Sequence, residues 1–429
     1  MPKDASFSKL VMGLIGPGLL PRLWGQKLNA AQNDPIKLSH MLLTTRGEVS
    51  GTAIADHILT LLEGLSNAKL LAFFAALRDD FEVDQEAVQA ALDRVKINDP
   101  KGLQALQMAA EPPRQELFRR LNAAPGGTGR LVALRCKLLK ALRDDPSLSP
   151  IDFDLRHLLR SWFNRGFLMP ARIDWNTPAA ILEKIIAYEA VHAIDTWDEL
   201  RTRLAPQDRR CFAFFHPAMP NEPLIFVEVA LTQGVTGNIQ EILKPARSAL
   251  AAEAADTAIF YSISNCQAGL AGVSFGAFLI KQVAADLKAE LPGLKTFCTL
   301  SPVPGLARWA KSQGYLPEGK RPAPETLSSL AADYLVNAKD SAGRPLDPVA
   351  RFHLGNGAEL HRINLDADSS AKGETQSLGV MVNYLYDLDT VEARHEAFAA
   401  SGTLAVARAI RSQSARAKPH KPEPRTQPE

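Results

Sequence analysis

Apolar residues recur at helical spacing through the first half of the chain. From about residue 50 to 204 they fall three or four positions apart, which is typical of amphipathic helices that pack one face together. Three such faces are Ile54, Ile58, Leu61, Leu62 and Leu65; Val88, Leu92 and Val95; and Leu131, Leu134, Leu138 and Leu142. Proline and glycine pairs interrupt the pattern and indicate turns. This half is predicted to be an all-helical bundle.

The pattern changes after Pro206, where short apolar runs alternate with turn residues. Such runs predict strands, and the intervening segments 239–254 and 273–290 have the periodicity of helices. The predicted strands are 211–216, 224–231, 258–264 and 296–300, with 360–364 and 380–386 as weaker candidates. The second half is therefore expected to be an α/β domain, and the whole chain to be of the α+β class.

The length of 429 residues exceeds the size at which one core keeps growing, so two domains are expected. We place the helical domain at residues 1–190 and the α/β domain at 191–411. The segment 412–429 is rich in Lys, Pro and Glu and lacks aromatic residues, which predicts a disordered tail.

Composition argues against several classes of function. The 49 Lys and Arg residues nearly balance the 47 Asp and Glu, and no long run of one sign occurs, so no nucleic-acid partner is expected. The four cysteines are widely spaced, without a CxxC pair, which argues against a zinc site or a disulfide framework and fits a reducing, cytoplasmic compartment. The apolar run at 10–20 is broken by glycine and proline and falls short of the ~20 residues of a membrane span, so neither export nor a membrane partner is expected.

The clearest chemical signal lies between residues 256 and 305. A strand-like run over 258–264 leads into a turn that contains Gly269 and Gly272, and a helix follows. Glycines let the backbone approach a ligand closely, and the free N–H groups of a helix start attract negative groups. This arrangement predicts a site for a phosphate-bearing molecule.

Four long blocks follow one another in the second half of the chain. They contain Phe-His-Pro-Ala-Met-Pro-Asn-Glu-Pro from residue 215, Ala-Gly-Leu-Ala-Gly-Val-Ser-Phe-Gly up to 276, Thr-Leu-Ser-Pro-Val-Pro-Gly from 299, and Asp-Pro-Val-Ala-Arg-Phe-His-Leu-Gly-Asn-Gly-Ala from 347. In this order they resemble the malonyl-CoA decarboxylase family. The resemblance is strongest over residues 189–386 and extends, in helical layout, over 40–188.

The resemblance implies an N-terminal helical domain used in assembly of a homo-oligomer and a C-terminal catalytic domain with the acetyltransferase-type (GNAT) fold. It implies that Ser301 and His353 form the catalytic pair. Contacts with coenzyme A are implied for Ala271, Gly272, Val273, Ser274, Phe275, Gly276, Ala277 and Ile280. Ser274 departs from an acidic residue found at this position in some relatives, so the backbone rather than this side chain is expected to bind.

The implied reaction converts malonyl-CoA to acetyl-CoA and CO2 through a thioester enolate. A catalyst must stabilise the developing oxyanion and deliver a proton to carbon. Because the thioester carbonyl is itself the electron sink, no metal is expected, and no separate cofactor, since coenzyme A is part of the substrate. Ser301 would hydrogen-bond the malonyl group, and Pro302 restricts its loop. His353, which can titrate near neutral pH, would donate the proton.

Several other polar residues have two interpretations. His216 is expected to be structural at a strand end, and Glu222 could orient a catalytic group or lie in a surface turn. Asn383 and Tyr384 are candidates for hydrogen bonds behind the catalytic pair. Lys281 could meet a phosphate of coenzyme A or be solvated.

Two other functions stay open. Gly272 to Gly276 also satisfies the G-x-S-x-G pattern of a serine hydrolase, with Ser274 as nucleophile, Asp347 or Asp366 as acid, and His353 or His361 as base. However, such a serine follows its strand directly, whereas Ser274 comes ten residues after Ser264. The third possibility is a non-catalytic CoA-binding protein, which would need neither Ser301 nor His353.

Overall fold

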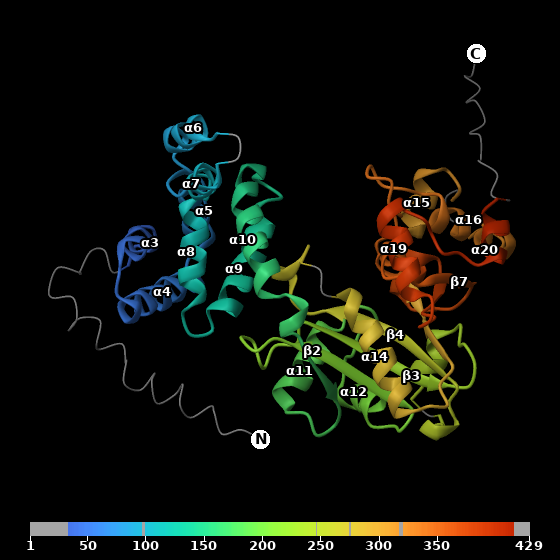
Figure 1. Cartoon of the computed structure of the whole chain (residues 1–429). Coiled ribbons are helices and arrows are strands. Elements are labelled where there is room, and N and C mark those ends of the chain that lie inside the picture. Colours follow the sequence, from blue (N-terminus) through green and yellow to red (C-terminus); the bar gives the residue numbers. More distant parts are fainter. Residues whose placement is uncertain (1–32, 97–98, 246, 274–275, 317–320, 416–429) are drawn as a thin grey trace, which may run out of the picture. The chain divides into compact units, whose positions relative to one another are not determined.

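The computed structural model describes residues 33–96, 99–245, 247–273, 276–316 and 321–415 (Figure 1). These residues form two compact units. One holds the residues up to Asn164 together with Gln267–Val273, and the other holds Arg165–Cys266 and the residues from Ser274 onward. The expected boundary at residue 190 thus lies within the second unit, because β1 and α11, which precede residue 190, pack against its sheet.

The first unit is built from helices and turns, as the apolar pattern predicts. Its α-helices are α3 (Pro35–Thr44), α4 (Glu48–Glu63), α5 (Asn67–Asp79), α6 (Gln85–Arg94), α7 (Pro100–Ala109), α8 (Pro113–Asn122), α9 (Gly127–Ala141) and α10 (Ser149–Trp162). Two 3-10 turns, η2 (Pro146–Leu148) and η5 (Ala268–Leu270), belong to the same unit. Ile54 and Ile58 of α4 and Leu131 and Leu138 of α9 are buried, so two of the three predicted faces lie in the core.

The third predicted face lies outside that core. Leu92 of α6 is 50% exposed, and Val88 and Val95 are only half-buried. The neighbouring α7 leaves Leu103 and Met108 exposed at 54% and 73%. Neither helix contains a buried residue. The periodicity therefore predicted α6 correctly but not the exposure of its apolar face.

The second unit is organised around a mixed sheet with the strand order β1-β2-β3-β4-β5-β8-β6, in which β7 also pairs with β8. The strands are β1 (Met169–Ile173), β2 (Arg209–Phe215), β3 (Ile225–Thr232), β4 (Thr257–Asn265), β5 (Thr296–Thr299), β6 (Ser301–Pro302), β7 (Glu359–Asn364) and β8 (Met381–Leu385). Among the pairs formed by these strands in the described residues, β4 and β5 are parallel and the others are antiparallel. All six predicted strands are confirmed.

Helices cover both faces of this sheet. They are α11 (Ala179–Tyr188), α12 (Trp197–Leu204), α13 (Ile239–Leu243), α14 (Gly276–Glu290), α15 (Leu306–Ser312), α16 (Pro324–Val336), α17 (Pro348–Gly355), α18 (Ala371–Ser377), α19 (Val391–Ser401) and α20 (Arg408–Ser414). The first two pack on the face that carries Cys211. Glu290, at the end of α14, bonds to Arg210 at 2.8 Å, and side chains alternate along a strand, so α14 lies over the opposite face (Figure 1).

Three expectations for this unit need correction. The described residues of 239–254 form α13 and the 3-10 turn η4 (Ala252–Ala254) rather than one long helix, because Pro245 in the middle of the segment interrupts a helix. Strand β1 lies in a region predicted to be helical, and its pairing with β2 supplies hydrogen bonds that its own sequence does not indicate. Helix α20 includes Ser412, although the predicted tail begins there; residues 416–429 lie outside the described part of the chain.

The described helices include none that is both long and apolar enough to span a membrane.

Candidate functional site

Ser301 and His353 meet inside the second unit. The Oγ of Ser301 lies 3.1 Å from Nε2 of His353. The two side chains are almost completely enclosed, with 6% of Ser301 and 2% of His353 exposed. A hydroxyl and an imidazole 52 positions apart in sequence are thus within hydrogen-bond distance in a nearly dry environment.

The sheet positions the serine. Strand β6 follows β5 after a single residue, Leu300, and Ser301 pairs with Val382 of β8. Because side chains alternate along an extended chain, Ser301 and Thr299 share one face while Leu300 enters the apolar cluster on the other. The Ser301 hydroxyl accordingly hydrogen-bonds Thr299 Oγ1 at 3.0 Å.

A short capped helix positions the histidine. Helix α17 begins after Asp347, whose Oδ1 accepts hydrogen bonds from the N–H groups of Val349 and Ala350, and Pro348 occupies the first turn. Asp347 is fully buried, and this burial raises the pKa of its carboxyl. His353 follows in the last turn of the same helix. The N-cap therefore fixes the start of the segment that carries the imidazole.

Aromatic residues of β8 and of the position after it enclose the imidazole. Tyr384 stacks on His353 with ring centroids 4.6 Å apart, and the Tyr386 hydroxyl lies 2.8 Å from Nδ1. Burial disfavours the charged ring and lowers the pKa of His353 to about 3. The imidazole is therefore neutral in the unliganded protein at physiological pH.

Two of these neighbours, Thr299 and Tyr386, were not selected from the sequence. The two-residue period of strands could have indicated them, because Thr299 lies two positions before Ser301, and Tyr386 two positions after Tyr384. Asn383, which was a candidate, donates a hydrogen bond to the Thr299 carbonyl at 2.7 Å. Asn383 thus lies behind the catalytic pair, as expected. Its hydrogen bond goes to the backbone of β5 and not to either side chain of the pair.

The segment expected to bind coenzyme A is partly fastened to the helical unit. The carbonyls of Gly269 and Ala271 accept hydrogen bonds from Arg135 of α9 at 2.6 and 2.8 Å. A Cβ on Gly269 would lie 1.9 Å from the Val132 carbonyl, so this glycine permits close packing on α9. Gly272 has φ of +75°, which favours glycine. The sequence predicted that the backbone at these glycines lies close to a ligand. At Gly269 it lies close to α9 of the same chain instead.

The other expected contacts with coenzyme A lie around the start of α14. The N–H of Val273 already bonds to the Leu270 carbonyl at 2.9 Å. Ser274 and Phe275 lie outside the described residues. Gly276 and Ala277 open α14, and Ile280 is fully buried in the second unit.

The remaining polar candidates have local partners. His216 accepts a hydrogen bond at Nδ1 from the Ala218 N–H, which fits the structural role expected for it. Glu222 pairs with Lys184 at 2.5 Å, and Lys281 pairs with Glu392 at 3.0 Å.

The hydrolase geometry is not assembled by the described residues. Ten residues separate the end of β4 at Asn265 from the start of α14 at Gly276, and they include the turn η5 rather than one sharp elbow. Asp347 serves as an N-cap, and the His353 Nε2 faces Ser301. Ser274 itself is not described.

No metal site is evident in the chain as far as it is described, since three or more His, Cys, Asp or Glu side chains nowhere gather as possible ligands. The four cysteines are free thiols; Cys211, Cys266 and Cys298 are buried. Burial raises the pKa of Cys298 to about 12, so it is not a reactive thiolate.

Comparison with known families and proteins identifies the relatives of the chain. The model of the malonyl-CoA decarboxylase C-terminal domain matches residues 166–320 and 318–424, and that of the N-terminal domain of the same enzyme matches 81–163. The mitochondrial malonyl-CoA decarboxylase of Mus musculus is 37% identical over 333 residues, which cover 66% of this chain and 67% of the relative.

Solved structures agree. The crystal structure of malonyl-CoA decarboxylase from Rhodopseudomonas palustris is 48% identical, with a TM-score of 0.84 over 89% of this chain and 99% of that one. The crystal structure of malonyl-CoA decarboxylase from Agrobacterium vitis is also 48% identical, with a TM-score of 0.83 and the same coverage of the two chains. Matching family models along most of the chain, close relatives and a shared fold lead to one conclusion: the chain belongs to the malonyl-CoA decarboxylase family.

Proposed function

We propose that the protein is a carboxy-lyase that converts malonyl-CoA to acetyl-CoA and CO2. Family membership supports the substrate and the reaction. The observation that carries the chemical part of the proposal is the buried 3.1 Å contact between Ser301 and His353. A binding protein would need no such enclosed pair.

Ser301 and His353 have separate roles in this reaction. The carbon–carbon bond to the carboxylate breaks, its electron pair moves into the thioester, and the resulting enolate must be stabilised and then protonated on carbon. The Ser301 hydroxyl hydrogen-bonds the malonyl group as this charge develops. His353 then delivers the proton to carbon.

The neutral state of His353 bears on the source of that proton. Burial keeps the free imidazole unprotonated, but the substrate brings a carboxylate, and a nearby negative charge favours imidazolium. We infer that substrate binding is accompanied by uptake of one proton at His353. This proton leaves on the methyl group of acetyl-CoA, which balances the reaction.

One arrangement of hydrogens satisfies the side chains around the pair. In the free protein the Tyr386 hydroxyl donates to Nδ1, the Nε2–H of His353 donates to Ser301, and Ser301 donates to Thr299; bound substrate replaces Thr299 as the acceptor of the Ser301 hydroxyl. In this arrangement Tyr386 holds the ring in the tautomer whose proton faces the serine. Tyr386 is a positioning residue for the catalytic pair.

Coenzyme A enters as part of the substrate, and we propose that residues 271–277 and Ile280 contact it, mainly through the backbone. The left-handed turn at Gly272 and the start of α14 support this assignment. No additional cofactor or metal takes part in the proposed chemistry.

The decisive experiment compares two serines. Purified protein is incubated with malonyl-CoA, with and without a chelator, and acetyl-CoA and CO2 are quantified. Ser301→Ala should lower turnover about 10²-fold or more, as expected for removal of one donor that stabilises the transition state. Ser274→Ala is the matched control and should change it far less. Release of free CoA and malonate, with labelling of Ser274 by a fluorophosphonate, would overturn the proposal in favour of a hydrolase.

We further propose that the protein works in the cytoplasm as a homo-oligomer assembled through the helical unit. The widely spaced free cysteines suit a reducing compartment. The exposed Leu92, Leu103 and Met108 supply an apolar surface that a second copy could cover.

A further inference from the structure

A small cavity lies on the face of the sheet that carries α12 and α13. It measures about 60 Å³ and is lined by Arg203, Arg209, Ile242, Lys244, Arg247 and Tyr261, among others. A volume of this size accommodates roughly four water-sized groups, similar to one tetrahedral oxyanion. Because three arginines and a lysine line it, the cavity is basic, and its volume suits a small ion.

The positive charges around the cavity exceed the negative ones. Two arginines share the carboxylate of Asp208: Arg247 donates a hydrogen bond to it at 2.8 Å, and a guanidinium nitrogen of Arg209 lies 3.6 Å from it. Arg203 is paired with Glu228 at 3.1 Å. Three guanidinium groups and Lys244 thus lie around the cavity, against Asp208, Glu228 and the nearby Glu189, which also acts on Arg203.

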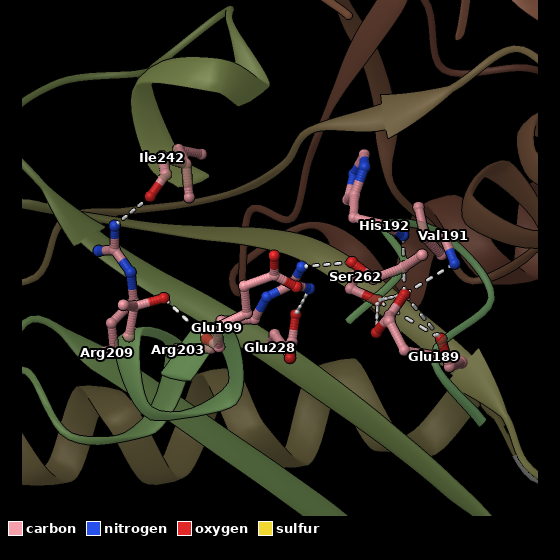
Figure 2. A network of polar contacts seen from close by, with 12 residues as sticks. Glu189, Val191, His192, Glu199, Arg203, Arg209, Glu228, Ile242 and Ser262 are labelled. Carbon is pink, nitrogen blue, oxygen red and sulfur yellow. Dashed lines mark hydrogen bonds and ion pairs between the residues drawn. The ribbon is translucent and has the colours of Figure 1, made fainter. Parts of the chain in front are cut away.

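Arg209 is the least compensated of these cations. Its guanidinium donates to two neutral carbonyls: that of Asp208 at 3.1 Å and that of Ile242 at 2.7 Å, which Figure 2 shows. Only 4% of Arg209 is exposed, and its burial, together with the nearby positive charge of Arg247, lowers its pKa. A buried cation in this position gains stability from an added anion.

A buried hydroxyl donor also lines the cavity. Tyr261 is 1% exposed, and its hydroxyl interacts electrostatically with Arg203 and Arg209. Glu228 is the neighbouring acceptor: an interaction with the Tyr261 hydroxyl lowers the pKa of the Glu228 carboxyl, although within the described chain neither the hydroxyl nor Glu228 Oε1 makes a hydrogen bond of normal geometry. Burial and the nearby Glu189 raise the pKa of Glu228, whereas its ion pair with Arg203 lowers it.

The cavity is distinct from the catalytic pair. Ile242 and Tyr261 share an apolar cluster with Cys298 and Leu300. Thr299 and Ser301 alternate with those two residues along the chain and point to the other face. The sheet therefore separates the cavity from Ser301 and His353.

We propose that this cavity is a binding site for a phosphate-sized oxyanion, either free inorganic phosphate or the phosphate end of a phosphomonoester. Arg209 and Arg203 supply charge-assisted hydrogen bonds, the Tyr261 hydroxyl supplies a neutral one, and Lys244 lies at the rim. The site does not depend on the decarboxylation proposed above.

Isothermal titration of the full-length protein with inorganic phosphate, at constant ionic strength against chloride, tests the proposal. Saturable binding of one phosphate per chain is expected. Tyr261→Phe, which removes only the hydroxyl, should weaken binding about two- to tenfold, and Arg209→Gln by about tenfold or more. Arg344→Gln, an exposed arginine paired with Asp340, is the matched control and should bind as the wild type does.

Two further measurements keep the test decisive. If Arg209→Gln does not fold, the exposed Lys244→Gln replaces it and should weaken binding by a smaller factor. Titration with phenyl phosphate distinguishes the sources: binding as tight as that of inorganic phosphate indicates a phosphomonoester, and much weaker binding indicates the free ion. No saturable binding of inorganic phosphate, or equal affinity in the wild type, Tyr261→Phe and the cation variants, would overturn the proposal.

Discussion

Burial determines the chemistry of the catalytic imidazole at the scale of single residues. His353 is enclosed by two tyrosines, and its pKa falls to about 3 because water cannot stabilise its charged form. The same enclosure strengthens any hydrogen bond or charge interaction with a bound substrate. The sequence suggested His353 because histidine usually titrates near neutral pH. In the free protein, however, its imidazole stays uncharged at neutral pH.

Replacing the proton donor tests its role. His353→Asn should lower kcat by about 10²–10⁴-fold, the usual contribution of a positioned acid, while the affinity for CoA changes little. Steady-state kinetics and CoA titration provide the two measurements. A loss of less than about tenfold would mean that another group protonates the enolate.

Removing the Tyr386 hydroxyl tests the positioning of the imidazole. Tyr386→Phe deletes one hydrogen bond to Nδ1, which should lower kcat roughly two- to tenfold and leave KM nearly unchanged. Tyr315→Phe, outside this cluster, serves as the control. A rise in KM with constant kcat would assign Tyr386 to substrate binding instead.

The depressed pKa of His353 also predicts how stability depends on pH. Below about pH 6.5 the unfolded chain binds a proton at this residue and the folded chain does not, so stability falls as pH decreases toward about 3. Between pH 6.5 and 5 this residue should account for a loss on the order of 1–2 kcal/mol.

Urea unfolding at pH 6.5 and pH 5, in the wild type and in His353→Asn, measures how much of the loss of stability is due to His353. The variant should lose less stability on acidification, because it lacks the group that titrates. His192, whose pKa burial lowers to about 4, acts in both proteins and cancels in the comparison. Equal losses in the two proteins would contradict the prediction.

At the scale of elements, short segments hold the functional side chains through caps and close packing. Helix α17 has only eight residues, and Asp347 and Pro348 at its start define where it begins. The turn η5 approaches α9 so closely that only glycine fits at residue 269. The helical unit therefore fixes one end of the segment proposed to bind coenzyme A.

Two glycine substitutions in the helical unit should have opposite effects on stability. Gly269→Ala places a Cβ against the Val132 carbonyl and should destabilise the unit by about 1–3 kcal/mol. Gly51→Ala, within α4, meets no atom closer than 3.8 Å and should stabilise it by about 0.5–1 kcal/mol. Denaturant unfolding gives both values. A neutral Gly269→Ala would show that η5 can move away from α9 without cost.

At the scale of the whole molecule, the exposed apolar side chains of α6 and α7 bear on the assembly proposed above for the helical unit. Leu103 and Met108 are more than half exposed on α7, and Leu92 is 50% exposed on α6. Isolated apolar residues on a surface are common, but a group of them on two adjoining helices favours an interface.

Charges introduced on this surface should prevent assembly. Leu92→Lys combined with Leu103→Lys should weaken self-association about 100-fold or more, since each leucine loses at least ~1.5 kcal/mol of burial. Leu71→Lys, on the exposed side of α5, is the control. Light scattering after gel filtration measures the mass. A wild-type monomer, or an unchanged mass in the double variant, would exclude this surface as the interface.

The sequence pattern was sufficient to predict those elements whose signal lies within a few consecutive residues. The strands around 211–216, 224–231 and 258–264 were predicted correctly because their apolar and β-branched runs end at turn residues. The two catalytic candidates came from their sequence blocks, and the structure brings them within 3.1 Å. Strand β1 was not predicted because its hydrogen bonds are supplied by β2.

Local sequence patterns therefore suffice to predict the helical first half, the strands of the second half, and the family with its candidate serine and histidine. Which apolar faces are buried, which side chains surround His353, and that Gly269 packs on α9 emerge only in the folded chain. These features depend on residues far apart in sequence, such as the 52 positions between Ser301 and His353. Periodicity reports the face on which a residue lies, whereas burial, pKa and hydrogen-bond partners arise from what the fold places opposite that face.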